Sequence, residues 1–152
     1  MMSVMVFTFI VISSGFMHFT VAQTVDTHLI GHWQGSGKII VTWCQQDTLP
    51  VDMTITPDGK VLGTIGDAQC EGIIKTNARL LRWLGNPHYV IECQLSGALV
   101  AQEGIQRQSI KLLVDYQDGQ LVGDFHSSGS KWGGKEKMML SGSHLVLTRH
   151  KQ

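Results

Sequence analysis

Apolar and polar residues alternate along much of the chain with a period of two, which is typical of strands that bury one face. In "VDMTIT" (51–56) every second residue is apolar, and "KVLGTIG" (60–66) repeats the pattern. Pro57-Asp58-Gly59 separates the two segments, and pairing apolar with apolar residues places Ile55 opposite Val61. That register needs a three-residue loop with glycine in the left-handed conformation, so the pattern predicts a β-hairpin.

A second hairpin is predicted over "LLVDYQDGQLVGDF" (112–125). Its apolar faces match when Tyr116 lies opposite Leu121, which leaves Asp118-Gly119 as a two-residue type I′ turn. Both hairpins carry a glycine in mid-strand, where it often marks a bend or a bulge. Two such hairpins indicate a curved antiparallel meander.

Further segments have strand-like patterns bounded by turn residues. They are 29–34, 38–44, 69–75, 88–96, 105–116, 136–141 and 144–149. The total is about eight to ten strands, depending on whether Gly35-Ser36-Gly37 and Ser141-Gly142-Ser143 are turns or kinks. We therefore predict an all-β fold, an antiparallel meander whose closure into a barrel would leave no unpaired edge strand.

One short helix is predicted at "ARLLRWLG" (78–85), and Asn86-Pro87 would end it. It carries Leu80, Leu81 and Trp83 beside two arginines. We interpret the helix as a plug over one end of the core. The alternative is a lid or a patch that faces a partner.

The two ends of the chain resemble those of calycins, the lipocalin-type and avidin-type barrels. "GHWQG" (31–35) matches their G-x-W start, and "HLVLTR" (144–149) matches their last strand, which bears an arginine. The resemblance implies a calycin-like barrel in which Trp33 closes one end and Arg149 packs across it as a cation–π pair.

The first 22 residues contain no charged side chain and end in small residues at Thr20 and Ala22. Their mainly apolar stretch, from Val4 to Met17, is only about 14 residues long, whereas a membrane span needs ~20. We therefore predict that 1–22 is a cleaved signal peptide, with a membrane anchor as the alternative. Cleavage would leave 23–152 as a single β-barrel domain, exported to a periplasmic or extracellular location.

Charge and motif context argue against nucleic acids and nucleotides as ligands. The chain has 12 basic and 12 acidic side chains, whereas a phosphate-backbone binder needs an excess of positive charge. "GSKWGGKE" (129–136) has the spacing of a phosphate-binding loop. However, Glu136 stands where that loop needs Ser or Thr, and the residues that follow have a strand pattern rather than a helical one.

The same glycine-rich loop, "HSSGSKWGGKEK" (126–137), could contact a ligand at the mouth of a barrel. It combines an aromatic side chain with ammonium groups and flexible backbone amides that can hold an anionic group. The candidate mouth residues are His126, Lys131, Trp132 and Lys135. The alternative is an ordinary loop between two strands.

Three cysteines, Cys44, Cys70 and Cys93, suit an exported protein with a disulfide. If 69–75 and 88–96 are partner strands, Cys70 and Cys93 lie opposite each other on the core face, and we favour this pair. Pairing of Cys44 with either of the others remains open. A three-cysteine zinc site lacks the C-x-x-C spacing that would support it.

The sequence contains none of the common catalytic motifs. There is no G-x-S-x-G elbow, no H-E-x-x-H pair and no evident pair of carboxylates. His28 and His32 are four residues apart, but without His-x-His spacing they are better explained as surface or hydrogen-bonded histidines. We expect no cofactor and no metal, and we favour a role other than catalysis.

Two functions fit these observations. The first is an exported barrel that binds a small apolar or amphipathic ligand in its interior. The second is an exported protein-interaction module with a filled core, such as a hydrolase inhibitor or an envelope assembly factor, whose partner is an extracytoplasmic protein. A packed interior would favour the second.

Overall fold

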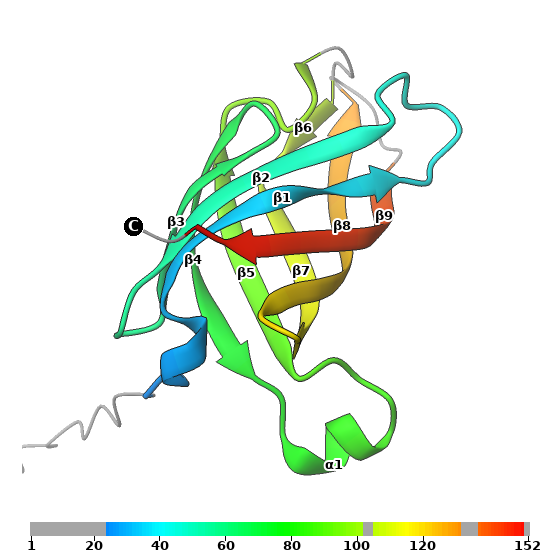
Figure 1. Cartoon of the computed structure of the whole chain (residues 1–152). Coiled ribbons are helices and arrows are strands. Elements are labelled where there is room, and N and C mark those ends of the chain that lie inside the picture. Colours follow the sequence, from blue (N-terminus) through cyan, green and yellow to red (C-terminus); the bar gives the residue numbers. More distant parts are fainter. Residues whose placement is uncertain (1–23, 102–104, 132–136, 151–152) are drawn as a thin grey trace, which may run out of the picture.

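The computed structural model describes residues 24–101, 105–131 and 137–150. Within them, nine strands form one antiparallel sheet, and eight of these close into a barrel (Figure 1). In chain order the strands are β1 (Gly31–Ile39), β2 (Thr48–Ile55), β3 (Lys60–Ile65), β4 (Ala68–Thr76), β5 (Tyr89–Ser96), β6 (Ile105–Arg107), β7 (Ser109–Gln117), β8 (Gln120–Lys131) and β9 (Lys137–Arg149). The predicted all-β fold is confirmed.

The barrel closes because β9 pairs with both β1 and β8. Around the wall the order is β8, β7, β5, β4, β3, β2, β1 and β9, and β6 adds to the last residues of β8. The 3₁₀ turn η1 (Thr27–Leu29) and the helix α1 (Arg79–Trp83) lie at one end, which we call the α1 end (Figure 1). The opposite end, where β6 lies, is the β6 end.

Both predicted hairpins have the expected register. Ile55 pairs with Val61 across a loop in which Gly59 has φ of 80°. In the second hairpin Tyr116 pairs with Leu121, and Asp118 and Gly119 have φ of 49° and 82°. The positive φ at both central residues is the conformation that a type I′ turn requires.

Of the two alternatives left open at Gly35-Ser36-Gly37, the kink is present, so 29–34 and 38–44 are not separate strands. β1 runs through Gly35-Ser36-Gly37 without a turn, and it ends at Ile39. Gly35 is needed because β9 passes close by: a Cβ at this position would lie 1.9 Å from the Val146 carbonyl oxygen. The register between β1 and β9 shifts between Ser36 and Lys38, so this stretch bends the strand rather than ending it.

β9 is likewise continuous through Ser141-Gly142-Ser143, so the kink alternative holds here too. An irregularity lies at His144, whose φ is 54°. The single strand expected at 105–116 is instead divided at Gln108. On either side of that residue, β6 and β7 pair with different parts of the long strand β8.

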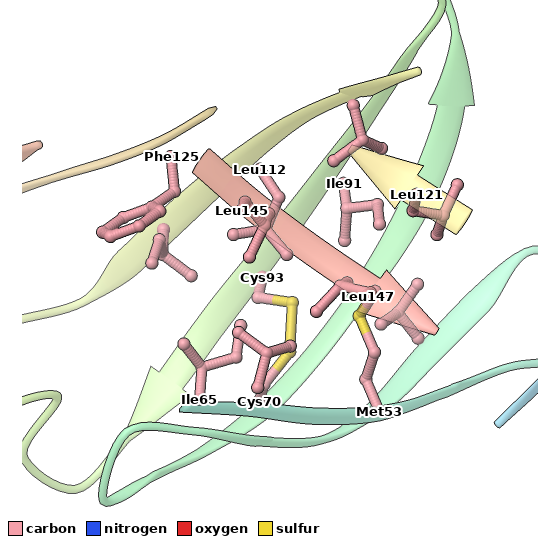
Figure 2. Packing of buried hydrophobic residues seen from close by; sticks show 14 of the residues in the cluster. Met53, Ile65, Cys70, Ile91, Cys93, Leu112, Leu121, Phe125, Leu145 and Leu147 are labelled. Atoms are coloured by element: carbon pink, nitrogen blue, oxygen red, sulfur yellow. A yellow bond between two sulfur atoms is a disulfide. The ribbon is translucent and has the colours of Figure 1, made fainter. Parts of the chain in front are cut away.

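The centre of the barrel is filled by side chains (Figure 2). Inward-facing residues from all eight wall strands expose at most 3 % of their surface: Trp33, Val51, Met53, Ile55, Val61, Ile65, Cys70, Ile91, Cys93, Leu112, Val114, Leu121, Phe125, Leu145 and Leu147. A chamber large enough for even one water molecule would leave accessible surface on the side chains that line it. These residues therefore form a packed core.

Cys70 and Cys93 form the favoured disulfide, which lies within this core (Figure 2). The expectation that they are directly opposite is wrong by two residues, since Cys70 pairs with Leu95 and Cys93 with Gly72. The bridge is therefore diagonal, with a Cα–Cα distance of 5.5 Å. Because Gly72 has no side chain, the Cys93 sulfur has room to reach across. Cys44 is a free, partly buried thiol.

The helix predicted at 78–85 is present as α1, but the interpretation of it as a plug is wrong. No residue of α1 is buried, and the helix stands away from the barrel end (Figure 1). The barrel end is instead closed by other side chains, which are described below. No helix among the described residues is long and apolar enough to cross a bilayer.

Candidate interaction site

The segment 77–88, which contains α1, projects from the barrel as an arm, and hydrogen bonds fix its base. The Asn77 backbone N–H donates to the His88 carbonyl at 2.8 Å, and its side-chain amide donates to the Pro87 carbonyl at 2.7 Å. The His88 backbone N–H donates to the Asp115 carboxylate of β7 at 2.7 Å. The two strands that carry the arm therefore hold it in one position on the barrel.

Hydrogen bonds within the arm also give partners to the polar groups of its turn. The Asn86 backbone and side-chain N–H groups donate to the Leu81 carbonyl at 3.1 and 2.9 Å. α1 ends at Trp83, and Gly85, which follows the C-cap residue Leu84, has the left-handed conformation common after helices, with φ of 86°. Arg82 contacts the His88 ring nitrogen Nε2, which ties the helix back to the base. The arm is thus an ordered element despite its small size.

The tip of the arm presents apolar side chains to solvent. Leu80, Trp83 and Leu84 expose 66 %, 80 % and 61 % of their surfaces. Arg79 is also exposed and Arg82 is partly exposed, while residues 77–88 contain no carboxylate. Large apolar side chains gathered at one exposed place, with positive charge beside them, mark a candidate interaction site.

Beneath the arm, a cluster of aromatic and hydrogen-bonding groups closes the α1 end. The buried Tyr89 hydroxyl donates to the Asp26 carboxylate at 2.6 Å and lies 3.2 Å from His28 Nε2. The His28 ring lies 4.4 Å from the Tyr116 ring. Burial, together with the hydrogen bond to Asp26, raises the pKa of Tyr89, so its hydroxyl stays protonated and acts as a donor.

Trp33 and Arg149 complete this closure. The buried Trp33 indole donates to the Leu29 carbonyl at 2.7 Å, and the Arg149 guanidinium lies 5.6 Å from the Trp33 ring centre. Arg149 also donates to the His28 carbonyl at 3.1 Å and contacts the Ile30 carbonyl. The contact that the calycin resemblance implies is therefore present, and the arginine also holds the segment before β1 in place.

At the β6 end, Arg107 is buried. Its guanidinium donates to the Ser127 carbonyl at 2.7 Å and to the Met138 carbonyl at 3.1 Å. It also lies 5.8 Å from the ring centre of Trp43, which comes from the loop after β1. These contacts join β6, β8, β9 and that loop, so we interpret Arg107 as a structural residue.

Of the predicted mouth residues His126, Lys131, Trp132 and Lys135, the structure describes the first two. His126 alternates with inward-facing neighbours and lines a shallow outer groove of about 450 Å³, together with Ile40 and other residues. It therefore lies on the outer face of the barrel wall. Lys131 ends β8 at the β6 end, while Trp132 and Lys135 lie outside the described residues.

The candidate lid residues Leu80, Leu81 and Trp83 lie at the α1 end, whereas the strand ends that flank the glycine-rich loop lie at the β6 end (Figure 1). The lid cannot cover that mouth, since the length of the barrel separates them. The partner-facing alternative is the one that fits their exposure.

The described residues do not assemble a recognisable catalytic or metal site. They contain no group of three or more His, Cys, Asp or Glu side chains that could hold a metal ion. His28 contacts Tyr89, while His32 Nε2 lies 2.6 Å from the Asp52 carboxylate on the outer wall. Hydrogen bonds from Gln34 and His32 lower the pKa of Asp52, which is typical of an ion-paired surface carboxylate rather than a general acid.

No protein-family model, curated protein or solved structure matches this chain.

Sequence reasoning missed the groups that join distant segments. Asp26 and Tyr89 are separated by 63 residues, and no local pattern links them. Arg107 sits in a strand-like stretch in which a charged residue would normally face solvent. The exposure of the arm could have been inferred from the sequence. Its two arginines have no carboxylate within 77–88 to pair with, and unpaired charges are rarely buried.

Proposed function

We propose that the protein is an exported interaction module with a filled core, which works through the arm at 77–88. In this proposal its partner binds outside the barrel, and the barrel is a rigid support. This is the second of the two functions that fit the sequence.

The packed centre of the barrel is the observation that carries this proposal. A pocket for a drug-sized ligand has a volume of about 300–1,000 Å³, whereas the central inward-facing side chains expose at most 3 % of their surface. Adding a ligand among them would require the core to open. The arm, by contrast, offers apolar groups that are already exposed and held in place.

Two further features support export and a calycin-like origin. A buried disulfide between Cys70 and Cys93 suits an oxidising compartment, and it agrees with a signal peptide at 1–22. The Trp33–Arg149 contact at the end of an eight-stranded barrel supports the calycin resemblance. In this proposal the calycin-type frame is kept, but its interior is used as a core.

Site-specific photo-crosslinking in an exporting host tests the proposal. A photoreactive phenylalanine analogue replaces Trp83 in one variant and Ile73 in a matched control, because Ile73 is an exposed apolar residue on the outer face of β4. We expect an adduct, with a protein or a membrane lipid, at position 83 that is absent at position 73. Native mass spectrometry of the unreduced protein is run in parallel.

Two results would contradict the proposal. One is a small molecule that the folded protein retains and releases on unfolding, which would indicate a ligand site inside the barrel. The other is equal crosslinking at positions 73 and 83, which would indicate that the arm is not a preferred contact surface.

A further inference from the structure

We propose that the arm docks onto the lipid–water interface of an anionic membrane, inserting Leu80, Trp83 and Leu84 among the headgroups. This inference rests on the proposed function, since it names the partner of the same arm.

The shape of the arm favours a soft partner. α1 lies at the outer end of a narrow projection (Figure 1), and its apolar side chains are exposed there. A stable protein interface uses about 20–30 residues on each side, which is more than the whole arm contains. A bilayer interface needs no complementary shape, so a few side chains are enough for reversible binding.

The charge of the arm selects the kind of membrane. Arg79 directly precedes the apolar residues, Arg82 lies among them in the sequence, and no carboxylate lies within 77–88 to cancel their charge. Asp115 of β7 accepts a hydrogen bond from the His88 backbone, at the base of the arm rather than at its tip. Arginine beside leucine and tryptophan is the composition of segments that bind anionic lipid headgroups.

The hydrogen bonds of the arm reduce the cost of entering the interface. Backbone groups that lose water must find partners elsewhere, and here the Leu84 N–H already donates to the Leu80 carbonyl at 3.1 Å. The Gly85 N–H donates to the Arg82 carbonyl at 2.9 Å. Trp83, the most exposed of the three apolar side chains, is of the residue type that membrane interfaces prefer.

Co-sedimentation of the mature protein with vesicles tests the inference. One vesicle preparation contains equal parts of phosphatidylglycerol and phosphatidylcholine, and the other contains phosphatidylcholine alone. We expect binding to the anionic vesicles that weakens as salt is added. Trp83→Ser should abolish it, and Arg79→Glu should weaken it by about fivefold or more, as expected for one cationic side chain near the surface. No α1 side chain is buried, so both variants should fold.

Two control variants make similar side-chain changes on the barrel wall, away from the arm. Leu62→Ser removes an exposed leucine from the outer face of β3, and Lys38→Glu makes the same charge change as Arg79→Glu near the β6 end. Both should bind the anionic vesicles like the unaltered protein. Equal losses in the control and arm variants would overturn the assignment of the arm.

Other outcomes separate this inference from the function on which it rests. If the unaltered protein does not bind anionic vesicles but position 83 crosslinks to a protein, the membrane inference fails and the interaction module stands. If Trp83→Ser converts a dimer to a monomer and vesicles have no effect, the arm binds a second copy instead, and the inference again fails. If position 83 also gives no adduct, both proposals fail.

Discussion

Arg149 contacts two parts of the molecule that are far apart in the chain. Its guanidinium lies over the buried Trp33 ring, and it donates to carbonyl groups of the segment 27–30 that leads into β1. A single side chain thus links the last strand to the start of the first. Because guanidinium is planar and always charged, it can stack and donate at the same time, which neither lysine nor methionine can do.

We predict that Arg149→Met lowers the free energy of unfolding by about 1–2 kcal/mol, since the cation–π contact and the charged hydrogen bonds are both lost. Urea denaturation measures this difference. Lys38→Met, which removes an exposed cation from β1, is the control and should have little effect. Equal midpoints for the two variants would indicate that Arg149 does not stabilise this end.

Glu92 is held by two lysines on the outer wall. The Lys75 and Lys111 ammonium groups lie 2.6 and 2.9 Å from its carboxylate oxygens, and they lower the pKa of Glu92 from 4.5 to about 2. The folded pKa is below the unfolded one. The stabilisation is therefore complete above about pH 4.5 and is lost as the pH falls towards 2.

Because folding lowers the pKa of Glu92, we predict that Glu92→Gln reduces the free energy of unfolding at neutral pH. The reduction should be at most about 1 kcal/mol, since solvent partly screens the ion pairs. The difference from the unaltered protein should shrink as the pH falls and disappear near pH 2. Denaturant titrations across this range test it. Glu71→Gln, on neighbouring β4, is the matched control; a difference independent of pH would rule out the ion pair as the cause.

At the scale of elements, sequence patterns succeeded where contacts are local. The two hairpins were predicted with correct register because a short turn fixes which residues face each other. The Cys70–Cys93 register was wrong by two residues because a long connection such as the arm, unlike a short turn, does not fix which residues of its two strands face each other. The strand ends at Ile39 and Gln108 depend on which distant strand lies alongside, and no local pattern records that.

Gly35 of β1 lies where the backbone of β9 passes very close. A Cβ at this position would meet the Val146 carbonyl oxygen of β9 at 1.9 Å, and that backbone cannot move without disturbing the barrel closure. We expect Gly35→Ala to lower the free energy of unfolding by about 2–4 kcal/mol. Ser36→Ala, at the exposed neighbouring position, should be nearly neutral. Thermal unfolding of the two variants compares them directly.

At the scale of the whole molecule, one disulfide crosses a core that eight strands share. Cys70 and Cys93 are separated by 23 residues, and the loop they close contains the arm. The pairing could be predicted because both cysteines share the apolar face of their strands. The packed interior could not, since one-face alternation looks the same for a hollow barrel and a filled one.

Replacing both Cys70 and Cys93 by alanine should lower the free energy of unfolding by about 3 kcal/mol, the effect expected for closing a loop of this length. The measurement is urea denaturation without reductant. Cys44→Ala, which removes the free thiol, should have a much smaller effect. If adding reductant to the unaltered protein leaves its midpoint unchanged, the bridge does not contribute this stability.

The position of the disulfide has a further consequence for the arm. Arg79 is exposed between the two bridged cysteines, so a trypsin-like protease that cuts after it would open the chain without releasing either piece. The product would be a two-chain protein, of full mass on a non-reducing gel and divided in two on a reducing one. Hydrolysis of one peptide bond could thus erase the shape of the arm while the barrel stays covalently whole.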